Sequence, residues 1–147
     1  MARKTTIPPL FKKLGIQPPP QCKAILLSDI AIVDVRTKKP SIVGVFDRFV
    51  LPDLPGTSPA CSLFLQFVRG IGIYAIAVEI HDLRKNVVLA KATVAAIEFE
   101  TPMSAINVQV PVPPLRLAYS GAYDIVVFAN GDAIDTAQFH VQTIKEA

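Results

Sequence analysis

The side chains that could do chemistry are few in this 147-residue chain, and they are widely separated. Only two histidines occur, His81 and His140, and neither stands at zinc-ligand spacing from the other or from a cysteine. Cys22 and Cys61 also lack metal-ligand spacing, and without an export signal they are expected to be free thiols. The sequence therefore predicts no metal ion and no other cofactor.

Motifs for covalent catalysis and nucleotide binding are also missing. The chain has no Gly-x-Ser-x-Gly turn and no phosphate-binding loop, and Gly70-Ile71-Gly72 lacks the third glycine of a dinucleotide-binding turn. Because a Ser-His-Asp triad assembles in space, spacing alone leaves that alternative open. Four carboxylates stand at predicted loop ends, where turn formation is a better interpretation than calcium binding: Asp53, Asp82, Asp132 and Asp135. We predict no catalytic residue and expect a protein that is not an enzyme.

The pattern Gly-x-Tyr-x-Ile-x-Val occurs twice, and each copy predicts a strand. Any functional site would have to be built on these strands and their neighbours. The pattern begins at Gly72 and again at Gly121, and each copy leads through a turn into a second apolar stretch. Alternation places four side chains of the first copy on one face of a strand: Tyr74, Ile76, Val78 and Ile80. Asn130-Gly131 favours a type I′ turn. The two copies predict two β-hairpins of one sandwich.

Further strands are predicted from apolar runs between polar or proline-rich turns, at 24–35, 41–51, 60–69, 87–99, within 101–117, and at 134–144. Asp29 lies inside the first run, where a buried carboxylate would need a partner such as Arg48 or a backbone amide. The count and the turn spacing predict an all-β, immunoglobulin-like antiparallel β-sandwich of about eight strands. The immunoglobulin-like part rests on the tyrosine at the start of a late strand, Tyr123.

Residues 1–22 predict an extended, proline-rich, basic N-terminal arm, and residues 23–147 the sandwich domain. Leu10, Phe11 and Leu14 would share a face of one helical turn. Together with Ile16 they are the predicted interaction residues, docking in a groove of the same chain or of a neighbour. A disordered leader is the alternative.

Composition bounds the class of protein. Hydrophobic residues make up 51% of the chain and charged residues 18%, against roughly 25% charged in typical soluble domains. Either the β core is apolar on both faces, or the surface is partly covered by copies of the chain or by another protein. No apolar run reaches the roughly 18 to 20 residues that a membrane span needs, and the missing signal sequence predicts a cytoplasmic location.

The basic charge is concentrated in the first 23 residues, which hold five of the 15 basic residues and no acid. The other residues therefore have ten basic against 12 acidic side chains, a net charge of −2. A basic groove for nucleic acid is therefore not expected.

Three stretches, AILLSDIAIVDV at 24–35, SIVGVFDRF at 41–49 and GAYDIVVFANG at 121–131, resemble a group of small bacterial β-sandwich proteins of unknown function. The resemblance covers residues 23–144. It implies a bacterial origin and a sandwich, and it supplies no activity and no functional residues.

The expected function is therefore that of a non-catalytic structural or assembly subunit that acts by protein–protein association. The partner is expected to be a second copy of the chain or another protein, with the arm docking on a neighbour. The alternative is a ligand- or peptide-binding module whose site lies between the 52–59 loop and the hairpin tips. An enzyme of unrecognised type is the least favoured interpretation.

Overall fold

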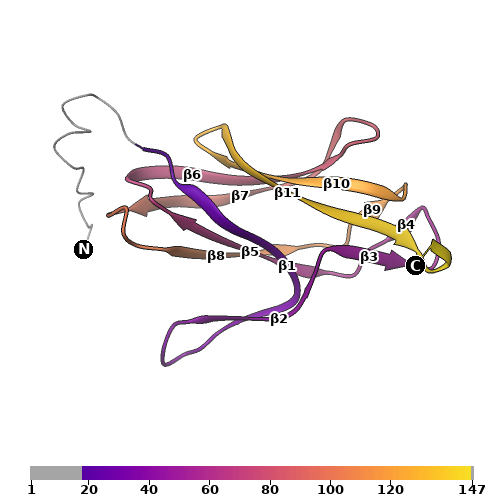
Figure 1. Ribbon diagram of the computed structural model, residues 1–147, viewed down its shortest axis with the longest axis horizontal. Coiled ribbons are helices and arrows are strands. Elements are labelled where there is room, and N and C mark those ends of the chain that lie inside the picture. The colour runs from indigo at the N-terminus through magenta and orange to yellow at the C-terminus, as the bar shows by residue number, and fades with distance from the viewer. Residues whose placement is uncertain (1–17, 147) are drawn as a thin grey trace.

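The computed structural model describes residues 18–146; residues 1–17 and 147, and the side chain of Ala95, lie outside the described part. Two sheets stack face to face, with strand orders β2-β1-β5-β8 and β3-β11-β10-β6-β7, and β4 pairs with β9 in a small third sheet (Figure 1). This arrangement confirms an all-β sandwich. The strands are β1 (Gln21–Val33), β2 (Pro40–Phe46), β3 (Arg48–Leu51), β4 (Gly56–Thr57), β5 (Cys61–Val68), β6 (Gly72–Asp82), β7 (Val87–Phe99), β8 (Ile106–Val112), β9 (Arg116–Leu117), β10 (Gly121–Ala129) and β11 (Asp132–Thr143), followed by the 3₁₀ helix η1 (Ile144–Glu146).

The repeated pattern forms two hairpins, as predicted, and their first strands lie at the centre of the larger sheet. Each copy opens a hairpin, β6–β7 and β10–β11, and the first strands of the two hairpins pair antiparallel with each other. Gly72 and Gly121 adopt φ of 107° and 129°, a region that side chains with a Cβ rarely occupy. Asn130 and Gly131 both have positive φ, 49° and 85°, as the predicted type I′ turn requires.

The core lies between the sheets and is held by aromatic rings. Tyr123 stacks on Phe139 with ring centroids 5.3 Å apart, and Phe99 meets Phe67 edge to face at 6.0 Å. The hydroxyl of Tyr123 donates to the carbonyl of Tyr119, four residues upstream, at 2.8 Å. A tyrosine corner in immunoglobulin-like domains makes this kind of bond, so the contact is consistent with that prediction.

The prediction of one strand over 41–51 is wrong. The chain leaves the smaller sheet after Phe46 and enters the larger one at Arg48, where β3 pairs parallel to β11. The crossing is fixed by a hydrogen bond of 2.9 Å from the His140 amide to the Asp47 carbonyl. Phe49 and Leu51 are each 5% exposed in the core, so their burial explains the crossing. It also adds a parallel edge to a sandwich that was predicted to be antiparallel.

Two further predictions need correction. The first strand begins at Gln21, inside the predicted arm, and Asp29 is exposed rather than buried. The end of the arm packs on the sandwich, since the Pro18 carbonyl accepts hydrogen bonds from the Ile71 amide at 3.3 Å and the Tyr74 hydroxyl at 3.1 Å. The four predicted interaction residues of the arm lie outside the described residues: Leu10, Phe11, Leu14 and Ile16.

Candidate interaction surface

The most distinctive surface is a two-stranded ribbon, residues 29–46, which we call the projecting hairpin. Strand β1 pairs with β5 only as far as Ser28, whereas its pairing with β2 continues to Val33. Beyond Ser28 the two strands leave the sandwich together (Figure 1). Among residues 18–146, the hairpin therefore has only its own two strands to satisfy its backbone and to cover its side chains.

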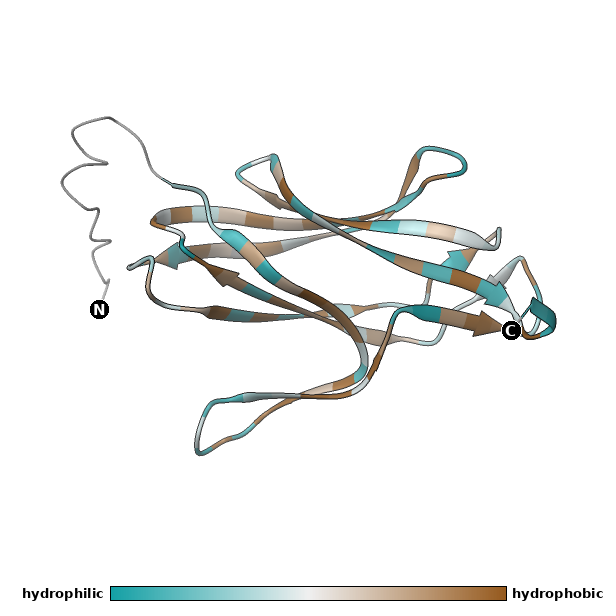
Figure 2. Cartoon of the chain, in the orientation of Figure 1, coloured by the Kyte–Doolittle hydropathy of each residue, from teal (hydrophilic) through white to brown (hydrophobic). Residues whose placement is uncertain are grey.

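One face of the projecting hairpin carries four exposed aliphatic side chains. Ile30 is 55% exposed, Ile32 54%, Val43 53% and Val45 56%. The register places them together, because Ile30 opposes Val43 and opposed residues of an antiparallel pair point to the same face. Figure 2 shows apolar colour on both strands and polar colour at the turn. A contiguous group of exposed aliphatic side chains marks an interaction surface more often than a surface that stays in contact with water.

The bend at the base of the hairpin is produced by small residues. The Ser28 hydroxyl, which is fully buried, donates to the Ile30 carbonyl at 3.3 Å. On β2, Gly44 has a φ of 73°. A Cβ at Gly44 would collide with the Asp29 carboxylate, so glycine allows both the backbone conformation and the close approach.

The turn at the tip is stabilised by Asp34. Its carboxylate accepts hydrogen bonds from the amides of Arg36 and Thr37, each at 2.8 Å. The Thr37 and Arg36 amides lower the pKa of Asp34 below the usual carboxyl value, because they bond to its charged form. Three exposed cations surround this turn: Arg36, Lys38 and Lys39.

An open hollow of about 410 Å³ lies between the base of the hairpin and the outer face of the smaller sheet. Asp29, Ile30, Ser62 and Gln109 contribute to its lining. The amide nitrogen of Gln109 is buried there with no hydrogen-bond partner among residues 18–146. Such a donor is costly when unpaired.

A second hollow, of about 420 Å³, is polar and lies where the alternative ligand site was predicted. The structure brings the 52–59 loop together with Arg84, Tyr119 and Lys145. The guanidinium of Arg84 lies 4.6 Å, and the Lys85 ammonium 5.1 Å, from the centroid of the Tyr119 ring, within cation–π range. Because acidic side chains also line it, the hollow has no single sign of charge.

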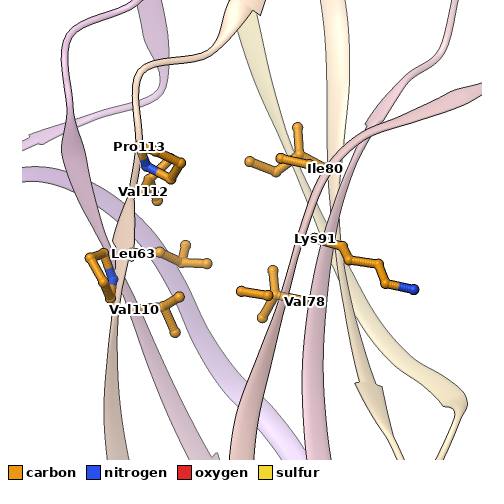
Figure 3. Close-up of a pocket in the computed structure, with 10 residues that line it drawn as sticks. Leu63, Val78, Ile80, Lys91, Val110, Val112 and Pro113 are labelled. Atoms are coloured by element: carbon orange, nitrogen blue, oxygen red, sulfur yellow. The ribbon is translucent and has the colours of Figure 1, made fainter.

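A third opening separates the free edges of β7 and β8 and reaches the core (Figure 3). Its volume is only about 60 Å³. Val78 and Ile80 face Leu63 and Val110 across it, and the ammonium of Lys91 points away. This crevice is a gap in packing, too small for a ligand of ordinary size.

The structure does not bring the chemistry-bearing residues together into a reaction site. His81 bonds Glu79 at 2.9 Å, and His140 is exposed on β11. Cys22 and Cys61 are free and buried. Burial, with a smaller contribution from Asp135, raises the pKa of the Cys22 thiol to about 12, which keeps it protonated and unreactive at neutral pH.

Asp82 behaves as the predicted turn residue, since it accepts the amides of Arg84 and Lys85 at 2.9 and 3.3 Å. Asp135 instead lies within β11, where it accepts the amide of Thr136, so its predicted place at a loop end is wrong. Within residues 18–146, no group of three or more His, Cys, Asp or Glu side chains could hold a metal ion. In the same residues, no helix has the length and apolar character needed to cross a membrane.

Sequence reasoning missed the projecting hairpin as a site. The run 24–35 predicts a strand buried on both faces, because Ile and Val occupy both alternating sets of positions. The available signal was Gly44 opposite the polar pair Ser28-Asp29, which marks where the ribbon leaves the sheet.

Comparisons with known proteins give a family and a distant structural similarity. No curated protein matches the chain. A solved structure, "Pseudomonas fluorescens alkylpurine DNA glycosylase AlkC bound to DNA containing an abasic site analog", is similar with 11% identity and a TM-score of 0.45. The match covers 80% of this chain and 30% of the glycosylase chain, so this chain spans less than a third of that protein. Similarity this weak carries no statement about activity. A family model matches residues 23–142, and the chain belongs to that family, DUF6941, a family of unknown function.

Proposed function

We propose that this protein is a non-catalytic β-sandwich subunit that acts by protein–protein association, in the first place with copies of itself. One observation carries the proposal: the projecting hairpin leaves Ile30, Ile32, Val43 and Val45 each more than half exposed. A two-stranded hairpin without further support is only marginally stable in water. A partner that covers this ribbon would stabilise it and remove apolar area from water at the same time.

The expected gain is large enough to matter. Full burial of a Val or Ile side chain contributes about 1.5–3 kcal/mol, so covering the exposed half of each side chain contributes about 1 kcal/mol. Main-chain hydrogen bonds to the free edge of β2 would add specificity by strand addition. The four side chains together would contribute about 4 kcal/mol, against the cost of lost translational and rotational freedom, so main-chain hydrogen bonds or a second contact would have to add to the affinity.

The N-terminal arm is the second contact in this proposal. Its basic residues and the predicted interaction residues Leu10, Phe11, Leu14 and Ile16 precede Pro18, which is anchored on β6. An arm that leaves the sandwich from a fixed point can reach a neighbour in the same assembly. The cytoplasmic location and bacterial origin predicted from the sequence belong to the same proposal.

The first experiment measures the solution mass of the full chain by light scattering at several concentrations. We expect a mass above the 15.9 kDa of the single chain, rising with concentration. The double variant Ile30→Ser/Val43→Ser should return the mass to that of one chain. The matched control, Ile73→Ser/Val88→Ser, changes two aliphatic side chains that are 60% and 50% exposed elsewhere and should associate normally. Circular dichroism checks that each variant is folded.

Deletion of residues 1–17 separates the contribution of the arm from that of the hairpin. The deletion stops before Pro18, so it keeps the contacts with Ile71 and Tyr74. We expect weaker association with an unchanged far-ultraviolet spectrum. A wild-type protein that stays at 15.9 kDa at every concentration would exclude self-association as the function.

The polar hollow beside the 52–59 loop supports a second candidate, the binding of a small polar ligand. The observation in its favour is the pair of cations, Arg84 and Lys85, held against Tyr119. Carboxylate- or phosphate-bearing compounds should then raise the melting temperature of the wild type. The Arg84→Ala variant should lose that response, and an equal response in both proteins would exclude this site.

A further inference from the structure

The base of the N-terminal arm lies beside one end of β7. The Pro18 carbonyl is held by the Ile71 amide at 3.3 Å and by the Tyr74 hydroxyl at 3.1 Å. The ring of Tyr74 in turn meets that of Phe99 edge to face, with centroids 6.0 Å apart, and Phe99 is the last residue of β7. The arm therefore joins the sandwich at the Phe99 end of that strand.

A group of aliphatic side chains, which we call the apolar strip, leads from this end of β7 to the crevice of Figure 3. In residues 18–146 no strand pairs with the outer edge of β7 or of β8, so the two sheets are open along this side. Ala92 also lines the crevice, so the strip connects the crevice with the Phe99 end of β7. Its members pack on the core but are only partly buried: Ala92, Val94 and Ile97 on β7, and Ile106 and Val108 on β8.

The crevice at the far end of the strip suits a single aliphatic side chain. Its volume of about 60 Å³ equals the space of about two water molecules in the liquid. Most of its walls are aliphatic, so water would gain little hydrogen bonding there. Lys91 belongs to the lining, but its ammonium points away from the opening (Figure 3). An extended segment passing over the crevice could therefore place one apolar side chain in it.

We propose that the chain's own arm docks on the apolar strip, extended along the edge of β7, with the side chain of Leu10 in the crevice. This inference deepens the arm contact of the proposed function, because it names the surface that the arm covers. Leu10 stands eight residues before Pro18, so an extended arm spans about 26 Å between them. Ala92 stands seven residues before Phe99, about 24 Å along the strand. The length of the arm therefore matches the distance to the crevice.

The sequence of the arm suits a strand in this position. Residues 10–17 contain no proline, whereas prolines stand on both sides of them, so each of their amides can donate to a strand edge. In an extended segment Leu10, Leu14 and Ile16 point to the same side. Lys12 shares that side, and its alkyl chain can lie on the strip while its ammonium reaches water. The extended form replaces the helical turn expected from the spacing, which would shorten the arm.

The chain's own arm fits this surface better than a strand from another protein. Because the arm is tethered at Pro18, its effective concentration at the strip is about millimolar. Its charge is also favourable, since the arm holds no acid and Glu98 and Glu100 lie where β7 ends. When chains associate, the arm of one copy can fill the identical crevice of the other, so the same contact also serves the proposed association.

Disulfide trapping in the full chain tests this placement. The double variant Leu10→Cys/Ala92→Cys brings two thiols together at the crevice, within the roughly 4.4–6.8 Å between Cα atoms that a disulfide spans. In dilute protein we expect a disulfide within one chain under mild oxidation, measured by peptide mass mapping. The matched control is Leu10→Cys/Thr93→Cys, because Thr93 is exposed and its side chain points to the other face of β7. The control should stay reduced.

Hydrogen exchange gives an independent result. Deletion of residues 1–17 should make the edge amides of residues 90–97 exchange roughly tenfold faster, because the arm no longer covers them. Leu10→Ser should give most of that increase, whereas Phe11→Ser should leave the rate unchanged, since its side chain points away from the strip. Equal trapping at positions 92 and 93, no trapping at 92, or an unchanged exchange rate after the deletion would overturn the proposal.

These outcomes are distinguishable from failure of the proposed function. If the wild type stays a single chain at every concentration while the disulfide at position 92 forms, the association fails and the docked arm stands. If the mass rises with concentration while trapping fails, the association stands without this contact of the arm. Disulfides at position 92 that form only between chains would overturn docking within one chain.

Discussion

In the β10–β11 hairpin, alternate residues of β10 are buried against the opposite sheet, whereas in the projecting hairpin the aliphatic residues stay half exposed. Ile125 on β10 is 2% exposed, and Ile32 on β1 is 54% exposed. Both are β-branched isoleucines in antiparallel strand pairs, so their own preference for a strand is the same. The difference lies in what covers them.

The comparison separates the apolar side chains that are buried within the single chain from those that stay exposed. The β10–β11 hairpin joins β6 on one edge and β3 on the other, and one of its faces is in the core. Within the described part of the chain, the projecting hairpin has free edges beyond Ser28 and no opposite sheet. Under the proposed association, this composition would serve a contact with a partner.

The same substitution in the two hairpins should give the largest contrast. Ile125→Ala removes a fully buried side chain and should lower the free energy of unfolding by about 2–5 kcal/mol. Urea denaturation measures this change. A loss below about 1 kcal/mol would mean that the core collapses around the cavity, and the contrast between the hairpins would disappear.

Removing one hydroxyl in the covered hairpin should have an intermediate effect. Tyr123→Phe leaves the ring stacked on Phe139 but removes the bond to the Tyr119 carbonyl. We expect a loss of about 0.5–1.5 kcal/mol in the free energy of unfolding. Tyr119→Phe is the control, because the carbonyl that accepts the bond belongs to the backbone and is retained.

Ile32→Ala should cost less than about 1 kcal/mol when measured on dilute protein, because half of the side chain is already in water. The cost should grow with protein concentration if the hairpin is covered in the complex. A loss equal to that of Ile125→Ala in dilute solution would break the comparison, since it would show that the hairpin is covered within one chain.

The smallest effect concerns the turn at the tip. The folded pKa of Asp34 is lowered by the Thr37 and Arg36 amides, so the turn is stabilised above the unfolded carboxyl pKa. That stabilisation is lost as the pH falls through the folded value. The amide resonances of Arg36 and Thr37 should titrate with a midpoint below 3.8. Asp34→Asn should abolish this titration and leave the core resonances unchanged.

Much of the fold could be predicted from the sequence because its signals are local. The Gly-x-Tyr copies, the Asn130-Gly131 turn and the alternating buried positions of β6 all fix local geometry, and the structure confirms them. The immunoglobulin-like relationship is supported only by the Tyr123 corner and stays a prediction. The arm residues lie outside the described part of the chain and stay predictions as well.

The predictions that the structure contradicts concern features that depend on contacts between segments distant in the sequence. Residues 41–51 are mostly apolar, and although Asp47 and Arg48 interrupt the apolar run, this polar pair does not show that β2 and β3 join different sheets. Strand β3 joins the larger sheet because it pairs with β11, a strand distant in the sequence. In the same way, Asp29 was expected to be buried because its neighbours are apolar, although its strand has left the sheet at that point. The candidate surface was missed for the same reason.

The crossing at Asp47 also has a consequence for how the chain folds during synthesis. Strand β3 pairs with β11, which follows all the other described strands in the sequence. Contacts of such long sequence separation form late. The apolar hairpin that adjoins β3 is made early, and the side of its base that leads into β3 is anchored only when most of the described chain has been made. Nascent chains on neighbouring ribosomes would therefore expose matching β2 edges to one another before either sandwich is closed, the stage at which unpaired edges favour premature association.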